Sequence, residues 1–510
     1  MVERNIKKVA RNTLYLYFRT IIVMLISIFT SRIILEALGV EDYGIYNVVG
    51  GFVSMFSIIS GTLVTASQRF IAFELGKQSS DISRVFSATV SIHVALSIII
   101  LFLLETVGLW FLNAEMNISE SRLFAANIVF QCSVITFAVN IISIPYNALI
   151  IAYERMSAFA YISIYEVLAK LLAVYALYVF VVDSLVLYAV FMLLIAITLR
   201  LIYGVYCHRN FKECRFIPAF DKSLYKEMLG FSGWNFIGSS AGILNNQGIN
   251  MLMNISFGVA LNAARGLANQ VDSAINMFVS NFMMALNPQI TKAYAATDYV
   301  YVNRIIISGT KCAFFLFWIL CSPVLINTEF ILNVWLVNVP DYTALFIRLG
   351  IIYTICQNLS QCLYTTMLAT GNIKKYQLVV GSLSILAFPF TWISYKTGNG
   401  AEYGYYMMIL FSLICLGARL KLISQMVPLF RWSVFVRKVL VPVILAASPV
   451  VMMWIVKCGV TRDITWGSFL LDSMTCCVLN LIFIWLIGLD KEEKGYITGY
   501  VRKRVNKYGK

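Results

Sequence analysis

The sequence predicts an all-α polytopic membrane protein with about 14 transmembrane helices. Of the 510 residues, 60% are hydrophobic and only 13% are charged. The mean hydropathy is +0.79, whereas a soluble domain is about half apolar and about a quarter charged. Apolar stretches long enough to cross a bilayer recur along the whole chain, and basic residues gather at alternate ends of these stretches.

The first helix is expected to remain in the mature protein. RNIKKVAR at the N-terminus is followed by an apolar run of about 25 residues, which is too long for a signal-peptide core and lacks a small-residue cleavage site. Segments of bilayer-spanning length follow at 12–36, 44–66, 85–110, 123–147, 157–180, 184–206, 228–254, 260–286, 305–325, 343–368, 376–395, 402–424, 435–456 and 467–489.

The distribution of Lys and Arg tests this assignment. With both termini in the cytoplasm, the cytoplasmic segments hold 29 of the 40 basic residues and the external loops hold four. A missed or invented helix would destroy this alternation, so an even number of helices is predicted. The net charge of +15 therefore reflects topology and not a nucleic-acid partner. Lys311 and Arg348 lie near helix ends and are expected to snorkel toward the interface.

The chain divides into two halves of six helices, with two more helices at the end. The predicted segments are an N-terminal lobe, a cytoplasmic connection, a C-terminal lobe, the last two helices and a basic cytoplasmic tail, at 1–206, 207–227, 228–424, 425–489 and 490–510. Leu38–Phe56 and Phe257–Phe278 occupy the equivalent turn of each half and share several residues. Such parallel repeats, with a site between them, are typical of transporters.

The segment Gly230–Tyr294 is long enough for two membrane-crossing helices, yet it is rich in Asn, Gln, Ser and Gly. Lipid cannot satisfy polar groups, so these are expected to face other protein or a water-filled cavity. We therefore expect this helix pair to line a hydrated central space, with Asn269 and Gln270 as candidate headgroup ligands. Pro288 is expected to end the second helix, because proline removes a backbone donor.

Three arginines at membrane depth give the sharpest functional signal. Arg19 lies about a third of the way into the first helix, Arg32 follows 13 residues later, and Arg265 begins the eighth helix. A cation at the centre of a membrane helix costs at least ~2.5–3.5 kcal/mol, so it normally has a partner or a cavity. Guanidinium groups suit an anionic headgroup such as a diphosphate. The alternatives are snorkelling or a structural pair with Glu36, Glu41 or Asp42.

Three acidic residues within helices are candidates for coupling transport to an ion gradient. Asp272 follows Arg265 by two turns on the same helix face, where it could serve as a charge partner, a proton or cation site, or a structural hydrogen-bond acceptor. Glu105 lies in the third helix. Glu166 precedes Lys170 by four residues, a spacing that favours a salt bridge and leaves both a structural and a coupling role open.

No pattern points to catalysis, and we expect neither enzyme activity, nor a cofactor, nor a metal site. The 11 cysteines are scattered without a CxxC pair, and two histidines are too few for a metal centre. The chain contains no nucleophile elbow, phosphate-cradling loop or HExxH pair. The external loops are too short for a domain.

Three stretches carry a family resemblance. They are LEALGVEDYGIYNVVGG after the first helix, ASQRFIAFELGK after the second, and ARGLANQVDSAINMFVSNFMMALNPQITKAYA in the second half. They resemble the matching stretches of bacterial O-antigen and capsule (Wzx-type) polysaccharide flippases. Those proteins belong to the multidrug/oligosaccharidyl-lipid/polysaccharide (MOP) exporter superfamily. In segment count and order, the resemblance spans nearly the whole chain.

The resemblance implies two pseudo-repeated six-helix lobes in a V plus two C-terminal helices, around a cationic cavity. It implies flipping of an undecaprenyl-diphosphate-linked oligosaccharide from the cytoplasmic to the periplasmic leaflet of the bacterial inner membrane, for O-antigen, lipopolysaccharide, capsule or exopolysaccharide synthesis. Related lipid II flippases use arginines of the first and eighth helices on the diphosphate, positions that fall on Arg19 and Arg265. A monomer is expected, working with the phospholipid bilayer, a polysaccharide polymerase and glycosyltransferases.

Two other functions compete with the flippase. A cation-coupled multidrug exporter of the same superfamily would favour acidic residues in the cavity, whereas the charges at membrane depth here are mainly basic. A polysaccharide polymerase or membrane glycosyltransferase would be an enzyme. The polymerase type needs a large external loop carrying arginines, which this chain does not offer.

Overall fold

In the computed structural model the described residues form helices joined by short connections, with no strand among them. The all-α class is therefore confirmed. The structure describes residues 2–54, 56–77, 81–114, 119–180, 182–215, 217, 221–257, 259–336, 339–458, 465–495 and 498–499. Within these ranges, some side chains of α1 (Val2–Ser54), α2 (Ser57–Gly76), α9 (Ile249–Phe257) and α10 (Val259–Ala295) lie outside the description.

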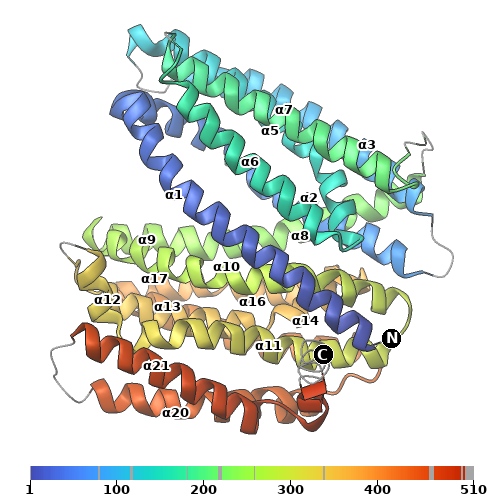
Figure 1. Cartoon of the computed structure of the whole chain (residues 1–510), viewed down its shortest axis with the longest axis vertical. Coiled ribbons are helices and arrows are strands. Elements are labelled where there is room, and N and C mark those ends of the chain that lie inside the picture. Colours follow the sequence, from blue (N-terminus) through green and yellow to red (C-terminus); the bar gives the residue numbers. More distant parts are fainter. Residues whose placement is uncertain are drawn as a thin grey trace, which may run out of the picture. The chain divides into compact units, whose positions relative to one another are not determined.

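The helices group into two compact units. The first is Lys8–Phe236, and the second is Ile237–Lys510 together with Met1–Lys7. Within each unit the helices run side by side (Figure 1). The boundary falls inside α8 (Lys222–Ile243), so a single helix contributes to both units. The predicted connection at 207–227 therefore belongs with the first unit.

The first unit begins with α1 and α2. It continues with α3 (Ile82–Leu103), α4 (Leu109–Ala114), α5 (Glu120–Ala152), α6 (Met156–Ala176) and α7 (Ser184–Asn210), and it ends within α8. A π-helical turn, η1 (Leu104–Gly108), joins α3 to α4. α1 is divided by Gly39, whose φ of 75° is readily adopted only by glycine. This kink falls within the predicted turn after the first helix.

The core of the first unit is built around α5, which packs against α7, α2 and α3. Its buried cluster is wholly apolar and includes Val49 of α1, Val129 and Ile141 of α5, and Leu185 of α7, each with no exposed surface. Burial of such side chains supplies the packing that positions the polar residues of α1, α6 and α7.

The predicted external end of the first unit is tied together by one arginine. Arg122 Nη1 donates to Asp183 Oδ2 at 2.6 Å, and its guanidinium also forms an ion pair with Asp42. Asp42 therefore pairs with Arg122. Burial of Asp183 acts to raise its pKa, but the hydrogen bonds and charge of Arg122 outweigh this effect and hold that pKa below its ordinary value.

The second unit contains the later helices α9, α10, α11 (Tyr299–Ile326), α12 (Thr328–Trp335), α13 (Thr343–Asn358), α14 (Gln361–Thr370), α15 (Ile373–Tyr376), α16 (Ser382–Ile385), α17 (Ala387–Lys396), α18 (Tyr403–Met426), α19 (Trp432–Phe435), α20 (Val441–Cys458) and α21 (Trp466–Phe483). Four π-helical turns interrupt this series: η2 (Leu244–Gly248), η3 (Gln377–Gly381), η4 (Val436–Leu440) and η5 (Ile484–Gly488).

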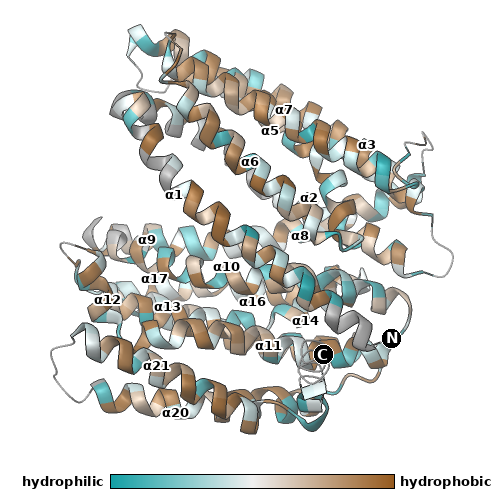
Figure 2. Cartoon of the chain, viewed as in Figure 1, coloured by the Kyte–Doolittle hydropathy of each residue, from teal (hydrophilic) through white to brown (hydrophobic). Residues whose placement is uncertain are grey.

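α10 lies at the centre of the second unit, in contact with α9, α11, α13 and α14. It continues to Ala295 through Pro288, so the prediction that Pro288 ends the helix is wrong. The missing backbone donor is tolerated because this part of the helix is packed among neighbours. The last two long helices, α20 and α21, pack against α11, where Asn480 Nδ2 donates to Ser322 Oγ at 2.8 Å. Apolar residues predominate along both (Figure 2).

Within the described residues, ten helices are long and apolar enough to cross a membrane. The other four predicted segments, 44–66, 228–254, 260–286 and 343–368, are helical as well. The first is divided between α1 and α2, and the last between α13 and α14. Segment 228–254 coincides with α8 and α9, on either side of η2, and segment 260–286 coincides with α10. The polar helix pair that the sequence singled out is therefore among the four segments that fall outside the ten apolar spans.

Candidate functional site

Arg265 is buried in the interior of the second unit. Only 1% of its surface is exposed. Nη2 donates to the Asn246 carbonyl oxygen at 3.3 Å, and Cζ lies 5.4 Å from the centre of the Tyr405 ring. Among the described residues, Nε and Nη1 have no hydrogen-bond partner. A guanidinium offers five N–H donors, so this one keeps most of its capacity for an acceptor that the described side chains do not provide.

Asp272 lies two turns further along α10, on the same interior side. The Thr354 hydroxyl of α13 donates to Oδ2 at 2.8 Å, while Oδ1 is buried without a partner among the described residues. Tyr405 of α18 lies near both Arg265 and Asp272. The structure therefore places a cation and an anion in one polar group without joining them in a direct ion pair.

The neighbouring face of α10 is polar and exposed. Asn269, Gln270, Ser273 and Ser280 are all accessible in this structure. An α-helix turns about 100° per residue, which puts Asn269 roughly 40° from Arg265 and Gln270 on the open face. Lipid-facing helix surfaces are apolar, so an exposed surface of this kind at membrane depth fits contact with water or a polar cargo.

Arg19 lies in a second polar group, within the first unit. It is half-buried, with Cζ 4.8 Å above the ring of Phe159 on α6. It interacts electrostatically with Tyr203 of α7 and Glu166 of α6. Its Nε is buried without a hydrogen-bond partner among the described residues. A cation–π contact and a distant carboxylate leave the guanidinium donors largely available.

The remaining predicted residues fall in different surroundings. Lys170 Nζ and Glu166 Oε1 are 2.6 Å apart, so the predicted i,i+4 salt bridge is present. Glu105 lies in η1 and accepts a hydrogen bond from Gln131 Nε2 of α5 at 2.9 Å, apart from the partners of Arg19. Arg32 lies in α1, but its side chain is outside the described residues.

Arg419 of α18 was not predicted as a site residue. It lies near the end of a predicted helix and was therefore assigned to the cytoplasmic cations. Its Nε donates to the Tyr376 hydroxyl at 3.0 Å, and Nη1 is buried without a partner among the described residues. Tyr353 interacts electrostatically with both Arg265 and Arg419. The spacing between Tyr405 and Arg419, about four helical turns, was the available signal that they share a face.

Lys311 was expected to snorkel, and that prediction is wrong. Its side chain is 2% exposed, and Nζ lies 2.5 Å from Glu493 Oε2 and 3.8 Å from Asp490 Oδ2. The carboxylates come from the segment that follows η5, so this buried cation joins α11 to the end of the chain. Arg348 is also paired, because Nη2 lies 2.8 Å from Glu329 Oε1.

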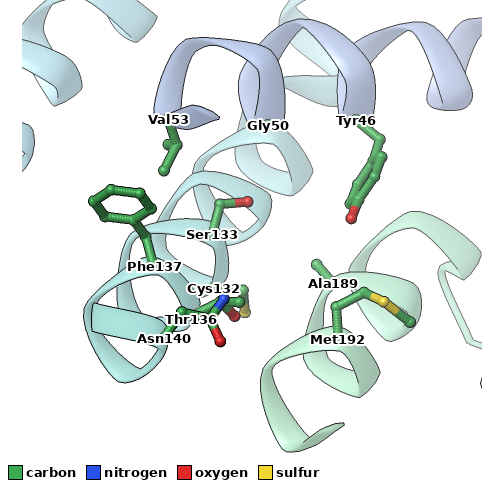
Figure 3. A pocket seen from close by; sticks show the side chains of 10 residues that line it. All are labelled: Tyr46, Gly50, Val53, Cys132, Ser133, Thr136, Phe137, Asn140, Ala189 and Met192. Carbon is green, nitrogen blue, oxygen red and sulfur yellow. The ribbon is translucent and has the colours of Figure 1, made fainter. Parts of the chain in front are cut away.

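A small neutral pocket of about 190 Å³ lies inside the first unit. Figure 3 shows side chains of α1, α5 and α7 around it, with the hydroxyl of Tyr46 and the polar atoms of Ser133, Thr136 and Asn140 on its walls. Thr136 Oγ1 is buried without a partner among the described residues. Hydroxyl and amide groups beside aromatic rings can bind uncharged, hydroxyl-rich molecules. The full lining consists of Tyr46, Gly50, Val53, Cys132, Ser133, Thr136, Phe137, Asn140, Ala189 and Met192.

Comparison with known proteins gives a family match and a shared fold. A family model described as "Polysaccharide biosynthesis protein" matches residues 9–294. No curated protein sequence matches the chain at a significant level. The family match includes α10 with Arg265 and Asp272, as well as every predicted site residue of the first unit.

Several solved structures have a similar fold. One is the outward-facing conformation of a multidrug resistance MATE family transporter of the MOP superfamily, with 13% identity, a TM-score of 0.66, and coverage of 82% of this chain and 96% of that one. Another is the MATE transporter ClbM in complex with Rb⁺, with 15% identity, a TM-score of 0.65, and coverage of 83% and 96%. A third is a MOP superfamily transporter from Pyrococcus furiosus, with 12% identity, a TM-score of 0.63, and coverage of 81% and 96%.

Proposed function

This chain belongs to the polysaccharide biosynthesis protein family, and from that premise we propose that it flips an undecaprenyl-diphosphate-linked oligosaccharide from the cytoplasmic to the periplasmic leaflet. Its family and fold are those of a multi-pass membrane transporter of the MOP superfamily. The proposed location is the bacterial inner membrane, with both termini in the cytoplasm. The proposed partners are the glycosyltransferases that build the cargo and the polymerase that uses it.

The observation that carries the proposal is the buried Arg265 guanidinium with unused donors, next to an exposed polar helix face. A diphosphate presents several anionic oxygens, and a planar guanidinium can donate two parallel hydrogen bonds to such a group. In a site of low dielectric constant these charge-assisted bonds are strong. Arg19 would supply a second cation, while Asn269 and Gln270 would contact the headgroup from the open face of α10. A contribution of Arg32 remains a prediction from the sequence.

Alternating access would let these cations bind cargo from one leaflet and release it to the other. Release requires that the cations lose their hold on the phosphate, and a nearby acid that gains or loses charge could do this. Asp272 is the best-placed acid, because it shares Tyr405 with Arg265. Glu105 and Glu166 of the first unit are the further candidates for coupling. The neutral pocket around Ser133 offers hydroxyl-rich cargo an uncharged surface.

The test is replacement of Arg265 by Gln in a strain whose own flippase has been deleted. We expect loss of surface polysaccharide and accumulation of the lipid-linked oligosaccharide in the cytoplasmic leaflet, at unchanged protein level. Arg348→Gln is the matched control, because it removes a cation of the same unit that Glu329 already neutralises. Wild-type output from Arg265→Gln and Arg19→Gln together would contradict the proposal.

A cation-coupled exporter of small molecules is the second candidate function. It is favoured by the unpartnered oxygen of Asp272, since a buried carboxylate oxygen is a ligand for a proton or an alkali cation. A strain expressing the protein would then tolerate cationic drugs, and Asp272→Asn would abolish that tolerance. A flippase instead restores surface polysaccharide and leaves drug tolerance unchanged, so the two readouts separate the candidates.

A further inference from the structure

A larger hollow, of about 850 Å³, lies at the predicted cytoplasmic end of the first unit. It is lined by residues of α3, α5 and α7 and of the segment that leaves α7. None of the side chains already assigned to the transport site lines it. Its lining consists of Phe86, Val90, Tyr146, Arg200, Leu201, Gly204, Val205, His208, Arg209, Cys214 and Arg215.

The rim of this hollow is cationic. Arg200, Arg209 and Arg215 all line it, and among the described residues no carboxylate lies within ion-pair distance of any of them. The neighbouring acid Glu213 interacts with Tyr153 instead. Burial raises the pKa of Cys214 to about 11, so its thiol adds no negative charge. The hollow therefore presents three uncompensated positive charges.

Contacts position the Arg200 side chain and the backbone of Arg215. Arg200 Cζ lies 3.9 Å from the centre of the Tyr146 ring. Gly204 makes room for it, since a Cβ there would come within 2.8 Å of Arg200 Nη1. Arg215 is positioned through its backbone, because its carbonyl oxygen accepts a hydrogen bond from the Ser87 hydroxyl at 3.3 Å. The Ile217 amide in turn donates to that hydroxyl oxygen at 2.8 Å.

One side of the hollow is apolar and open to the surroundings. Leu201 and Val205, one turn apart on α7, are 60% and 52% exposed. In a membrane this surface faces acyl chains. Arg209 and Arg215 follow it in the chain and lie at the depth of the headgroups, whereas Arg200 lies deeper, beside Leu201. Phe86 forms part of the buried floor. A cationic rim above an apolar, lipid-facing wall is complementary to a molecule with a phosphate head and hydrocarbon tails.

We propose that this hollow binds the phosphate headgroup of an anionic phospholipid from the cytoplasmic leaflet, separately from the transported cargo. The arginines hold the phosphate, and the acyl chains lie along Leu201 and Val205. The bound lipid fixes the cytoplasmic end of α7 and the segment after it relative to α3. The site uses no residue of the Arg265 group, so its test is independent of the proposed transport function.

The test measures lipid binding to the intact purified protein by native mass spectrometry, with phosphatidylglycerol and phosphatidylcholine as probes. We expect preferential retention of phosphatidylglycerol. Each of Arg200→Gln, Arg209→Gln and Arg215→Gln should weaken this preference by about fivefold, and the triple variant by about 100-fold, given ~1 kcal/mol per basic residue near a headgroup. Gly204→Ala keeps every charge but displaces the Arg200 guanidinium, so it should also weaken the preference.

Arg84→Gln is the matched control, because it removes a cation from the same end of the unit that already pairs with Asp221. It should bind phosphatidylglycerol as the wild type does. Inorganic phosphate in excess separates a lipid site from a free-anion site, and it should leave the lipid bound. The proposal is overturned if the triple variant retains the wild-type preference, if Arg84→Gln weakens binding as much as Arg200→Gln, or if phosphate alone displaces the lipid completely.

Discussion

Arg265 and Lys311 are both buried cations of the second unit, each with 1% of its surface exposed. Their surroundings differ completely. Lys311 has one carboxylate within 2.5 Å and a second within 3.8 Å. Arg265 has a single carbonyl oxygen at 3.3 Å, a sulfur at 3.7 Å and an aromatic ring, and two of its three nitrogens lack a partner among the described residues.

The comparison separates a structural cation from one with a proposed role in binding cargo. A buried ion pair is tolerated when each charge has its partner. Removal of one partner leaves the other charge buried and uncompensated, which destabilises the protein strongly. A buried cation without a carboxylate weakens the fold in which it lies. The diphosphate proposed above would bring the negative charge that Arg265 lacks. Burial alone is therefore a poor indicator of function, whereas burial without compensation is a good one.

The largest expected effect concerns stability, at Lys311. Lys311→Met leaves Glu493 without its cation, and we expect the free energy of unfolding to fall by about 3 kcal/mol. This value is near the lower end for buried ion pairs, because Asp490 and Glu493 are partly accessible to solvent. Thermal unfolding in detergent measures this loss. The Lys311→Met/Glu493→Gln double variant should recover much of it, and equal losses in the single and double variants would show that Glu493 is not the relevant partner.

Arg265→Gln should have the opposite profile, with a large effect on transport and none on stability. Losing two charge-assisted hydrogen bonds to phosphate corresponds to roughly a 100-fold slower flipping rate. The unfolding midpoint should be unchanged or slightly higher, because unsatisfied buried donors are removed. Flipping is measured in proteoliposomes with a labelled lipid-linked oligosaccharide. A drop in the unfolding midpoint as large as that of Lys311→Met would place Arg265 among the structural cations.

Asp272→Asn tests the anion that shares the interior of α10 with Arg265. The amide oxygen can still accept the hydrogen bond from Thr354, so the fold should be retained. We expect the flipping rate to fall about tenfold, which is less than the ~10²-fold or more that a positioned acid or base contributes to a catalysed reaction. The rate should also become independent of the imposed ion gradient. If the Asp272→Asn variant still responds to the gradient, Asp272 is not the coupling residue, and Glu105 and Glu166 become the candidates.

The sequence predicted the class of fold and the polar character of the helix that carries Arg265, because both depend on local composition. A helix as polar as α10 cannot face lipid, whichever way its neighbours pack. The Glu166–Lys170 salt bridge was predictable for the same reason, since its spacing is set by the helix itself. Contacts between distant parts of the chain were not. Glu493, the partner of Lys311, is 182 residues away in the sequence. A local periodicity cannot predict a contact at that separation.

Arg419 and Pro288 show two further limits of local reasoning. Arg419 satisfies the positive-inside rule by its position, and only its contact with Tyr376 on another element reveals a buried role. Pro288 carries a strong local signal for helix termination, yet tertiary packing keeps α10 helical to Ala295. In both residues the surroundings supplied by other helices override a preference that the sequence expresses clearly.

The smallest expected effect is at Arg122, a cation that is paired, like Lys311, but partly exposed. The pKa of Asp183 is lower in the folded state than its ordinary value. The ionised carboxylate therefore stabilises the fold at every pH above its unfolded-state pKa of about 3.9. This contribution disappears as the pH falls through the lower, folded-state pKa. Solvent screening limits the effect to well under about 1 kcal/mol. Unfolding midpoints of wild type and Asp183→Asn should therefore differ slightly and constantly from neutral pH to about pH 5, and converge at more acidic pH. A difference that grows on acidification would show that Asp183 is not ionised in this ion pair.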